Sequence, residues 1–227
     1  MQGGPIKDEF VCGAILFDLD GVLVDSRQAV ENSWRQWASE RGVHNDALLQ
    51  LAHGRRTSES LPEIAPHLDV ATEVANLERI ESEMTRGLFP VSGAQALLKA
   101  LGPGQWAIVT SGSAKVALAR MKYCGIPTPS VFVTANDIKN GKPAPDGYLT
   151  AAERLGIPPA ECIVIEDTRA GIASGKAGRM TVIAVDGTEK PEALQQADSV
   201  AGKLANIRVQ PMSEQRLLVT VRAGSRM

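Results

Sequence analysis

The sequence predicts an α/β fold, namely a doubly wound parallel sheet into which a helical subdomain is inserted. Short apolar runs bounded by turn residues alternate with helical patterns along most of the chain, which is typical of buried parallel strands joined by helices. A length of 227 residues suits a core domain with a smaller insertion. One interval of about ninety residues, between the first apolar run and the second, holds no convincing strand and marks the insertion.

Five apolar runs are predicted as strands, at residues 11–17, 106–110, 131–133, 163–165 and 182–185. Helices are expected to begin at Ser92, at Ser113 and near Pro145, where proline suits a first helical turn. This alternation favours an open α/β sheet, in which ligands bind outside the carboxyl ends of the strands.

Residues 26–88 are interpreted as a helical cap. Val30, Trp34 and Trp37 recur at helical spacing, and so do the apolar residues between 70 and 84. Such an insertion, hinged at both ends, is expected over the carboxyl edge of the sheet. The predicted domains are therefore a core of residues 1–25 and 89–210, the cap of residues 26–88, and a C-terminal tail of residues 211–227 to which the sequence assigns no role.

The composition limits the partners of the protein. A formal net charge of -2, with 22% charged residues, argues against a nucleic-acid partner and against an anionic membrane surface. The N-terminus lacks a basic flank and a long apolar stretch, so secretion is not expected. The three cysteines form no Cys-x-x-Cys pair, which favours reduced core residues in a cytoplasmic protein.

Two carboxylates follow the first apolar run. Asp18 and Asp20 stand two residues apart, and Gly21 after them is free to turn sharply. Carboxylates this close repel each other unless a cation or a shared proton compensates, and Mg²⁺ is a hard ion that prefers such oxygen ligands. Taken alone, the pair favours a solvated acidic turn.

The other strand ends carry polar groups of complementary kinds. Ser111 and Gly112 follow the second apolar run at a helix start, where unpaired N–H groups favour an oxyanion. Lys142 follows the third run between a glycine and a proline and could meet a phosphate as a point charge. Glu166 and Asp167 follow the fourth run and offer further oxygen ligands for a metal. Each segment alone could be an ordinary cap, surface lysine or acidic turn.

Together, the four segments resemble the signature motifs of the haloacid-dehalogenase-like hydrolase superfamily, and the resemblance extends over residues 11–185. It implies that Asp18 attacks phosphorus to form an aspartyl-phosphate and that Asp20 serves as general acid and then as general base. It further implies a Mg²⁺ ion, with Glu166 contributing directly or through water, and a phosphoryl-binding set. The implied metal ligands are Asp18, Asp20 (through its carbonyl) and Asp167, and the implied phosphoryl contacts are Ser111, Gly112 and Lys142.

Differences among family members narrow the reaction. Asp20 distinguishes phosphoryl-transfer enzymes from dehalogenases, which resemble this pattern without a second aspartate there. The β-phosphoglucomutases carry a histidine where this chain has Val30, and phosphonate-cleaving members need a cap lysine, which residues 26–88 lack. A Mg²⁺-dependent phosphatase is therefore predicted. A β-phosphoglucomutase-like isomerase and a non-catalytic protein that accepts phosphate or binds phosphometabolites stay open as alternatives.

The cap resembles those of small sugar and polyol phosphatases. Arg56, preferred over Arg55, is expected to meet the substrate phosphate, and Glu31 to accept sugar hydroxyls. Trp34 and Trp37 could stack on a sugar, although both also fit the buried stripe of a helix. The expected substrate is a sugar or polyol phosphate, and the expected state is a monomer or weak dimer.

Residues 171–177 look like a nucleotide-binding P-loop but depart from it. Three residues rather than four separate the glycines, and alanine replaces the magnesium-binding Ser or Thr. We interpret Gly171 and Gly175 instead as positions where a helix packs closely against the sheet.

Overall fold

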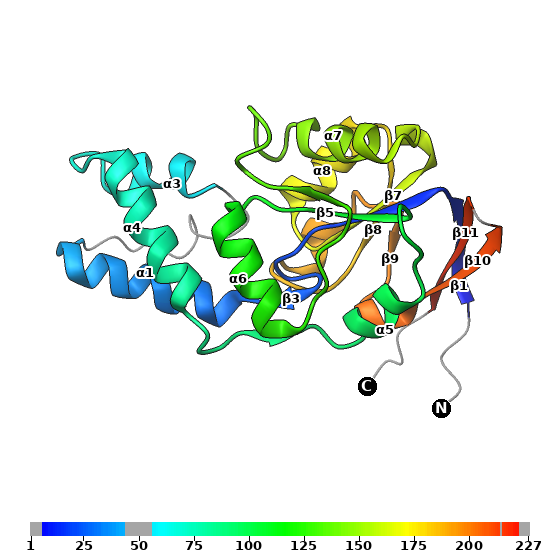
Figure 1. The fold of residues 1–227 in the computed structure, drawn as a ribbon, viewed down its shortest axis with the longest axis horizontal. Helices are drawn as coiled ribbons and strands as arrows, with labels where there is room; N and C mark the ends of the chain where they lie inside the picture. Colours follow the sequence, from blue (N-terminus) through cyan, green and yellow to red (C-terminus); the bar gives the residue numbers. More distant parts are fainter. Residues whose placement is uncertain (1–5, 44–55, 214, 223–227) are drawn as a thin grey trace.

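The computed structural model describes residues 6–43, 56–213 and 215–222 of the chain (Figure 1). Its centre is a six-stranded, wholly parallel sheet in the order β6-β5-β2-β7-β8-β9. The strands are β2 (Ala14–Phe17), β5 (Trp106–Val109), β6 (Val131–Val133), β7 (Cys162–Glu166), β8 (Thr181–Ala184) and β9 (Ser199–Val200). The α/β fold with a parallel sheet is thus confirmed, while β9 had no counterpart in the predicted strands.

Helices cover both faces of this sheet. Side chains alternate between the faces along a strand, so Ile15 and Phe17 of β2 join one core and Ala14 and Leu16 the other. The first core is covered by α5 (Ala94–Lys99) and α6 (Ala114–Cys124), and the second by α7 (Asp146–Leu155) and α8 (Arg169–Ala177). Short 3-10 turns occupy Pro159–Glu161, Pro191–Leu194 and Leu204–Asn206.

The first predicted strand, residues 11–17, is wrong as a single element. The chain bends at Gly13, whose N–H donates to the Glu161 carbonyl at 2.8 Å, and the part before the bend leaves the parallel sheet. That part is β1 (Ile6–Cys12), which pairs antiparallel with β11 (Arg216–Arg222), and β11 pairs with β10 (Ile207–Ser213). Buried Leu217, Val219 and Val221 attach this second sheet to the core, so residues 215–222 of the tail have a packing role.

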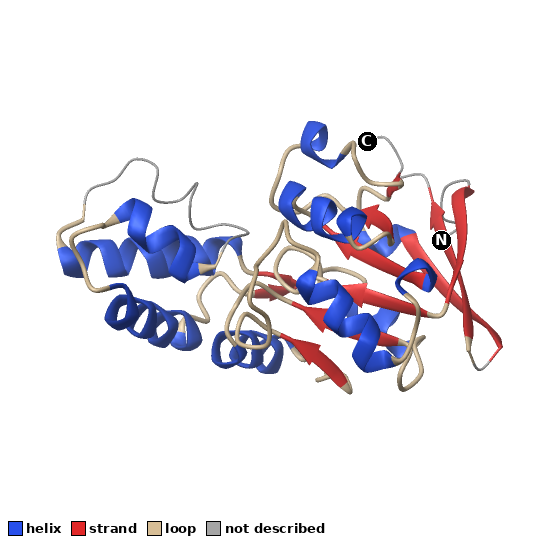
Figure 2. Ribbon diagram, turned by 90° about the horizontal axis from the view of Figure 1, so that it is seen from above, coloured by secondary structure: helices blue, strands red, loops and turns tan. Residues whose placement is uncertain are grey.

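Three helices form a cluster away from the sheet. They are α1 (Arg27–Arg41), α3 (Thr57–Ile64) and α4 (Val70–Glu83), and we call them the cap helices. The chain leaves and re-enters the core through β3 (Val24–Asp25) and β4 (Phe89–Pro90), which pair antiparallel. The cap helices and the second sheet lie at opposite ends of the molecule, with the parallel sheet between them (Figures 1 and 2).

Both cap tryptophans are buried. Trp34 and Trp37 are 1% and 0% exposed and meet edge to face, with ring centroids 5.9 Å apart. The Trp37 indole N–H donates to Glu73 Oε2 at 2.7 Å, which joins α1 to α4. None of the described helices is both long enough and apolar enough to cross a membrane.

Candidate active site

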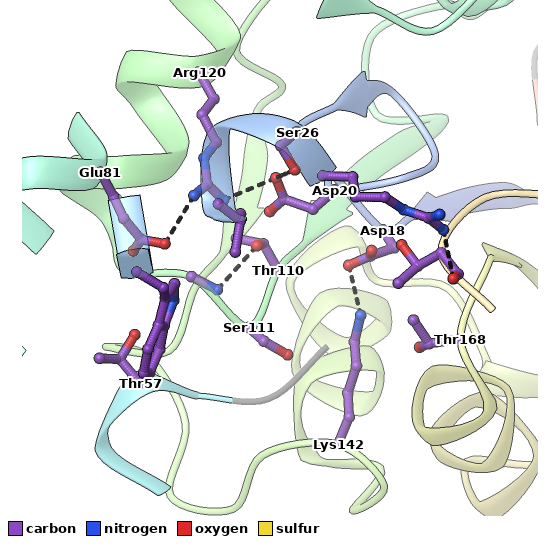
Figure 3. Close-up of a pocket in the computed structure, with 15 residues that line it drawn as sticks. Asp18, Asp20, Ser26, Thr57, Glu81, Thr110, Ser111, Arg120, Lys142 and Thr168 are labelled. Carbon is purple, nitrogen blue, oxygen red and sulfur yellow. Dashed lines mark hydrogen bonds and ion pairs between the residues drawn. The ribbon is translucent and has the colours of Figure 1, made fainter. Parts of the chain in front are cut away.

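A cavity lies at the carboxyl ends of β2, β5 and β7, between the sheet and the cap helices. Its wall combines residues that follow these strands with residues of the cap (Figure 3). From the core come Asp18, Asp20, Thr110, Ser111, Gly112, Arg120, Lys142, Thr168 and Thr188, and from the cap side come Ser26, Arg27, Val30, Trp34, Thr57 and Glu81. Parallel strands all point the same way, so segments far apart in sequence reach one edge.

Asp18 and Lys142 form a close charged contact in this cavity. Lys142 Nζ lies 2.6 Å from Asp18 Oδ1 and 2.6 Å from Glu166 Oε1, and its side chain is 8% exposed. Burial alone would lower the pKa of the Lys142 ammonium, but the two carboxylates outweigh it and raise that pKa well above its ordinary value. Lys142 is therefore a fixed positive charge directed at Asp18.

Glu166 anchors this lysine rather than facing the cavity. Its Oε1 accepts from Lys142 Nζ and from the Tyr148 hydroxyl at 3.0 Å. Its Oε2 accepts from the Asp167 N–H, the Thr168 N–H and the Thr168 hydroxyl, at 2.9, 3.0 and 3.0 Å. Burial opposes ionisation, yet Lys142 and these donors lower the pKa of Glu166, so its carboxylate is charged.

Two glycines of α8 allow the close packing of this helix against the sheet that the sequence predicted. A Cβ on Gly171 would lie 1.7 Å from Glu166 Oε1, and a Cβ on Gly175 would lie 2.8 Å from Val182 Cγ2. The helix can therefore approach the sheet closely only because neither residue has a side chain.

Asp167 is buried and only partly satisfied. Its Oδ2 accepts from the Thr188 N–H at 2.7 Å, while its Oδ1 has no hydrogen-bond partner within the described part of the chain. Burial, with Glu166 close by, raises the pKa of Asp167 to about 7. Carboxylate oxygens of Asp18, Glu166 and Asp167 lie within 4.8 Å of one another, a cluster that could hold a metal cation.

Asp18 responds to the same surroundings. Burial raises the pKa of its carboxyl well above the ordinary value, and the nearby Glu166 and Asp167 add to this, while Lys142 opposes them. A cation beside these groups would favour their ionised forms.

Ser111 and Gly112 lie in the cavity wall, and their role as phosphoryl contacts stays a prediction. The N–H of Gly112 donates to Thr110 Oγ1 at 3.0 Å in this structure. Helix α6 begins directly afterwards at Ala114, whose N–H donates to Asn136 Oδ1 at 3.0 Å.

Asp20 has partners that were not predicted. Its Oδ1 accepts from the Ser26 hydroxyl at 2.6 Å and from Arg120 Nη1 at 2.9 Å. Arg120 Nη2 in turn donates to Glu81 Oε1 of α4 at 3.2 Å. The Asp20 carboxylate is not part of the cluster formed by Asp18, Glu166 and Asp167, and the backbone carbonyl of Asp20 stays the predicted metal ligand.

The signal for Arg120 and Glu81 was present in the sequence. Arg120 continues the apolar stripe of α6, four residues after Val116 and directly before Met121. Glu81 stands four residues after Leu77 in the buried stripe of α4. A charged residue on a buried stripe needs a partner, and each provides one for the other.

The predicted cap contacts, Arg56 and Glu31, are not in the cavity wall. Arg56 donates to the carbonyls of Lys139 and Ile138 at 3.0 and 3.2 Å and so ties the start of α3 to the loop that precedes Lys142. Glu31 pairs with Arg35 at 3.5 Å on α1. Their roles as substrate contacts stay predictions, and Arg55 lies outside the described residues.

Comparison with known proteins agrees with this geometry. Residues 15–185 match the family model described as haloacid dehalogenase-like hydrolase. The chain is 45% identical over 203 residues to hexitol phosphatase A of Escherichia coli, covering 87% of this chain and 94% of that protein. It is 34% identical over 184 residues to glycerol-1-phosphate phosphohydrolase 2 of Saccharomyces cerevisiae, covering 76% and 74% of the two chains.

Solved structures are similar as well. A β-phosphoglucomutase from Clostridium difficile matches with a TM-score of 0.71 at 26% identity, covering 87% of this chain and 93% of that one. CbbY from Rhodobacter sphaeroides, in complex with phosphate, matches with a TM-score of 0.76 at 21% identity, covering 86% and 95%, a likeness of fold alone. The family model covers most of the chain, and the protein therefore belongs to the haloacid dehalogenase-like hydrolases.

Proposed function

We propose that the protein is a phosphatase that hydrolyses a small sugar or polyol phosphate through an aspartyl-phosphate on Asp18, with Mg²⁺ as cofactor. The observation that carries the proposal is the buried Asp18 carboxylate, 2.6 Å from the Lys142 ammonium and beside Asp167 in a cavity that reaches the cap. The relatives named as phosphatases for hexitol and glycerol-1-phosphate support it.

The donor set fits Mg²⁺. Asp18 and Asp167, with the backbone carbonyl of Asp20, would hold the ion. The Oδ1 of Asp167 supports this, because it has no hydrogen-bond partner among the described residues and a buried carboxylate oxygen needs a donor or a cation. When bound, the ion would offset the repulsion between carboxylates and the charge on the phosphoryl oxygens. Glu166 is already occupied by five donors, so a direct bond from it to the metal is not part of the proposal.

In the first step, an Asp18 carboxylate oxygen forms a bond to phosphorus while the bond from phosphorus to the leaving oxygen breaks. Asp20 gives its carboxyl proton to that oxygen, which departs as an alcohol. In the second step, water bonds to phosphorus and passes a proton to Asp20, and the bond from phosphorus to Asp18 breaks. Inorganic phosphate leaves, and both residues return to their starting state.

Lys142, Ser111 and Gly112 are proposed to hold the phosphoryl oxygens. Lys142 would donate from its ammonium, Ser111 from its hydroxyl and Gly112 from its N–H. These donors would stabilise the negative charge that spreads over the phosphoryl oxygens in the transition state. The leaving group would then lie toward the cap, against apolar Val30 and Trp34 and polar Thr57. A mixed apolar and polar wall suits a carbon chain bearing hydroxyls.

Val30 favours hydrolysis over isomerisation. It lines the cavity at the position where the resemblance places the histidine of β-phosphoglucomutases, and it offers no group that moves a proton. The isomerase alternative therefore rests on similarity of fold with the mutase structures.

The decisive experiment is a phosphate-release assay over hexitol, hexose, deoxyhexose, glycerol and glycolate phosphates, with Mg²⁺ and with a chelator. We expect Mg²⁺-dependent release that Asp18→Asn abolishes, and a higher KM in Arg56→Ala or Glu31→Ala if those residues meet the substrate when it binds. No release from any substrate would refute the proposal, and stoichiometric phosphorylation without turnover would instead support a phospho-accepting protein.

A further inference from the structure

A chain of buried charges connects Asp20 with the cap. Arg120 and Glu81 have side chains only 7% and 9% exposed, and Arg120 uses one arm of its guanidinium for Asp20 and the other for Glu81. Asp20 and Arg120 belong to the core, whereas Glu81 belongs to cap helix α4, so this pair of contacts crosses between the two (Figure 3).

Ser26 forms a second connection to the same carboxylate. It occupies the N-cap of α1, where a serine hydroxyl ordinarily accepts a hydrogen bond from a backbone N–H of its own helix. Here it makes no such cap bond and donates to Asp20 Oδ1 instead. The Asp20 carboxylate is therefore held from the start of one cap helix and, through Arg120, from another.

Both bonds fall on the same oxygen, and this has a chemical consequence. Oδ1 accepts from Ser26 and from Arg120, so a proton can reside on it only if one of these donors is displaced. Oδ2 is left to carry the proton that the leaving group receives. An acid whose proton is confined to one oxygen has a defined direction of transfer.

Resting on the role proposed for Asp20, we infer that Arg120 is a positioning residue that orients the Asp20 carboxylate through Oδ1 and, through Glu81, couples that orientation to the packing of cap helix α4 against α6. Asp20 is then an efficient general acid only when cap helix α4 is packed against α6. Arginine suits this place because its planar fork contacts two carboxylates at once, which a lysine ammonium does with less geometric control.

The test measures phosphoenzyme formation in a single turnover, by rapid quench with Mg²⁺ present, for aryl and alkyl phosphates. A p-nitrophenolate leaves without a proton, whereas a polyol alkoxide needs one. Loss of general-acid assistance should therefore slow the alkyl phosphate selectively, by about 10²-fold or more in Asp20→Asn. A generally damaged site would slow both substrates alike.

Arg120→Gln should reproduce this selective loss, with the alkyl phosphate slowed at least about tenfold and p-nitrophenyl phosphate almost unchanged. Glu81→Gln retains the volume and keeps Arg120 on Asp20 but weakens the link to the cap, so it should show the same selectivity to a smaller degree. Glu83→Gln is the matched control, because Glu83 lies on the same helix and is exposed and paired with Arg79. It should behave as the unaltered protein.

Equal losses for both substrates in Arg120→Gln, or identical behaviour of Glu81→Gln and Glu83→Gln, would overturn the inference. If Arg120→Gln does not fold, the comparison of the two glutamate variants decides alone. Absence of any phosphoenzyme in the unaltered protein would overturn the proposed function and the inference with it. A selective loss in Asp20→Asn without one in the Arg120 and Glu81 variants would overturn the inference alone.

Discussion

Replacing Gly171 by alanine tests how the close approach of α8 supports the site. The new Cβ would lie 1.7 Å from Glu166 Oε1 and 1.9 Å from its carboxyl carbon, whereas ordinary contacts begin at about 3.4 Å. Either the helix or the carboxylate must move. Helix movement is resisted by Gly175, which packs against Val182 and Val164, so we expect the carboxylate to be displaced.

The expected loss of stability follows from the hydrogen bonds that the Glu166 carboxylate accepts. Five hydrogen bonds converge on its carboxylate, from Lys142, Tyr148, Asp167 and Thr168. Loss of two of them costs about 3–6 kcal/mol, since bonds to a charged group contribute about 1.5–3 kcal/mol each. Alanine returns about 1 kcal/mol of helix propensity. The free energy of unfolding should therefore fall by about 2–5 kcal/mol.

Urea denaturation measures this change, and phosphate release measures its effect on the site, because Lys142 loses one of its two anchors. Gly178→Ala is the matched control: it lies just after the same helix with φ -74°, and its Cβ would meet its nearest neighbour, a backbone oxygen, at 3.3 Å. A Gly171→Ala protein as stable as the Gly178→Ala protein would refute the reasoning.

Three further predictions concern charged groups. Lys142→Met should lower kcat by about 10²–10³-fold, as for the loss of a hydrogen-bond donor to the transition state. Steady-state kinetics measure this, and a rise in KM with unchanged kcat would contradict the prediction. Burial raises the pKa of Asp167 to about 7 from 3.8, so the metal-free folded state binds the extra proton and its stability should fall as pH rises through this window. Mg²⁺ at a hundredfold excess over its Kd should raise the free energy of unfolding by about 2.7 kcal/mol, and by less at pH 6 than at pH 8, because protons compete with the ion for Asp167. Thermal unfolding measures both the pH dependence and the effect of Mg²⁺, and Asp167→Asn should remove both. Glu73→Gln should cost about 1.5–3 kcal/mol at pH 7 by weakening the bonds from Trp37 and Arg41. Despite opposing burial, these bonds lower the pKa of Glu73 below 4.5, so the difference should vanish as pH falls through that lowered pKa, and equal stabilities at pH 7 would contradict the assignment.

The sheet edge of the site could be predicted because each of its residues follows a strand directly. Asp18, Ser111 and Asp167 stand at the ends of apolar runs, and the parallel arrangement that those runs imply brings their side chains together without further information. Lys142 lies nine residues after β6, in a loop, and depended on the resemblance for its assignment. Its role as the partner of Glu166 became visible only in the structure.

The second sheet could not be predicted for a different reason. Residues 11–17 are apolar throughout, so their pattern does not indicate that the chain changes from one sheet to another at Gly13. The division is decided by β11, more than two hundred residues away, which pairs with β1 from Cys12 back to Ile6. Pairing over such a distance leaves no mark in a local window of sequence.

Arg120 and Glu81 lie between these extremes. Each is a charged residue within an apolar stripe, and a buried charge requires a partner of opposite sign. The sequence therefore indicates that each residue is paired, but it does not identify the partner. The partner depends on how α4 packs on α6, which is a property of the cap docked on the core. The same dependence argues for a functional role. Because the contact between Arg120 and Glu81 forms only when α4 packs on α6, it can couple the position of the cap to the orientation of the Asp20 carboxylate.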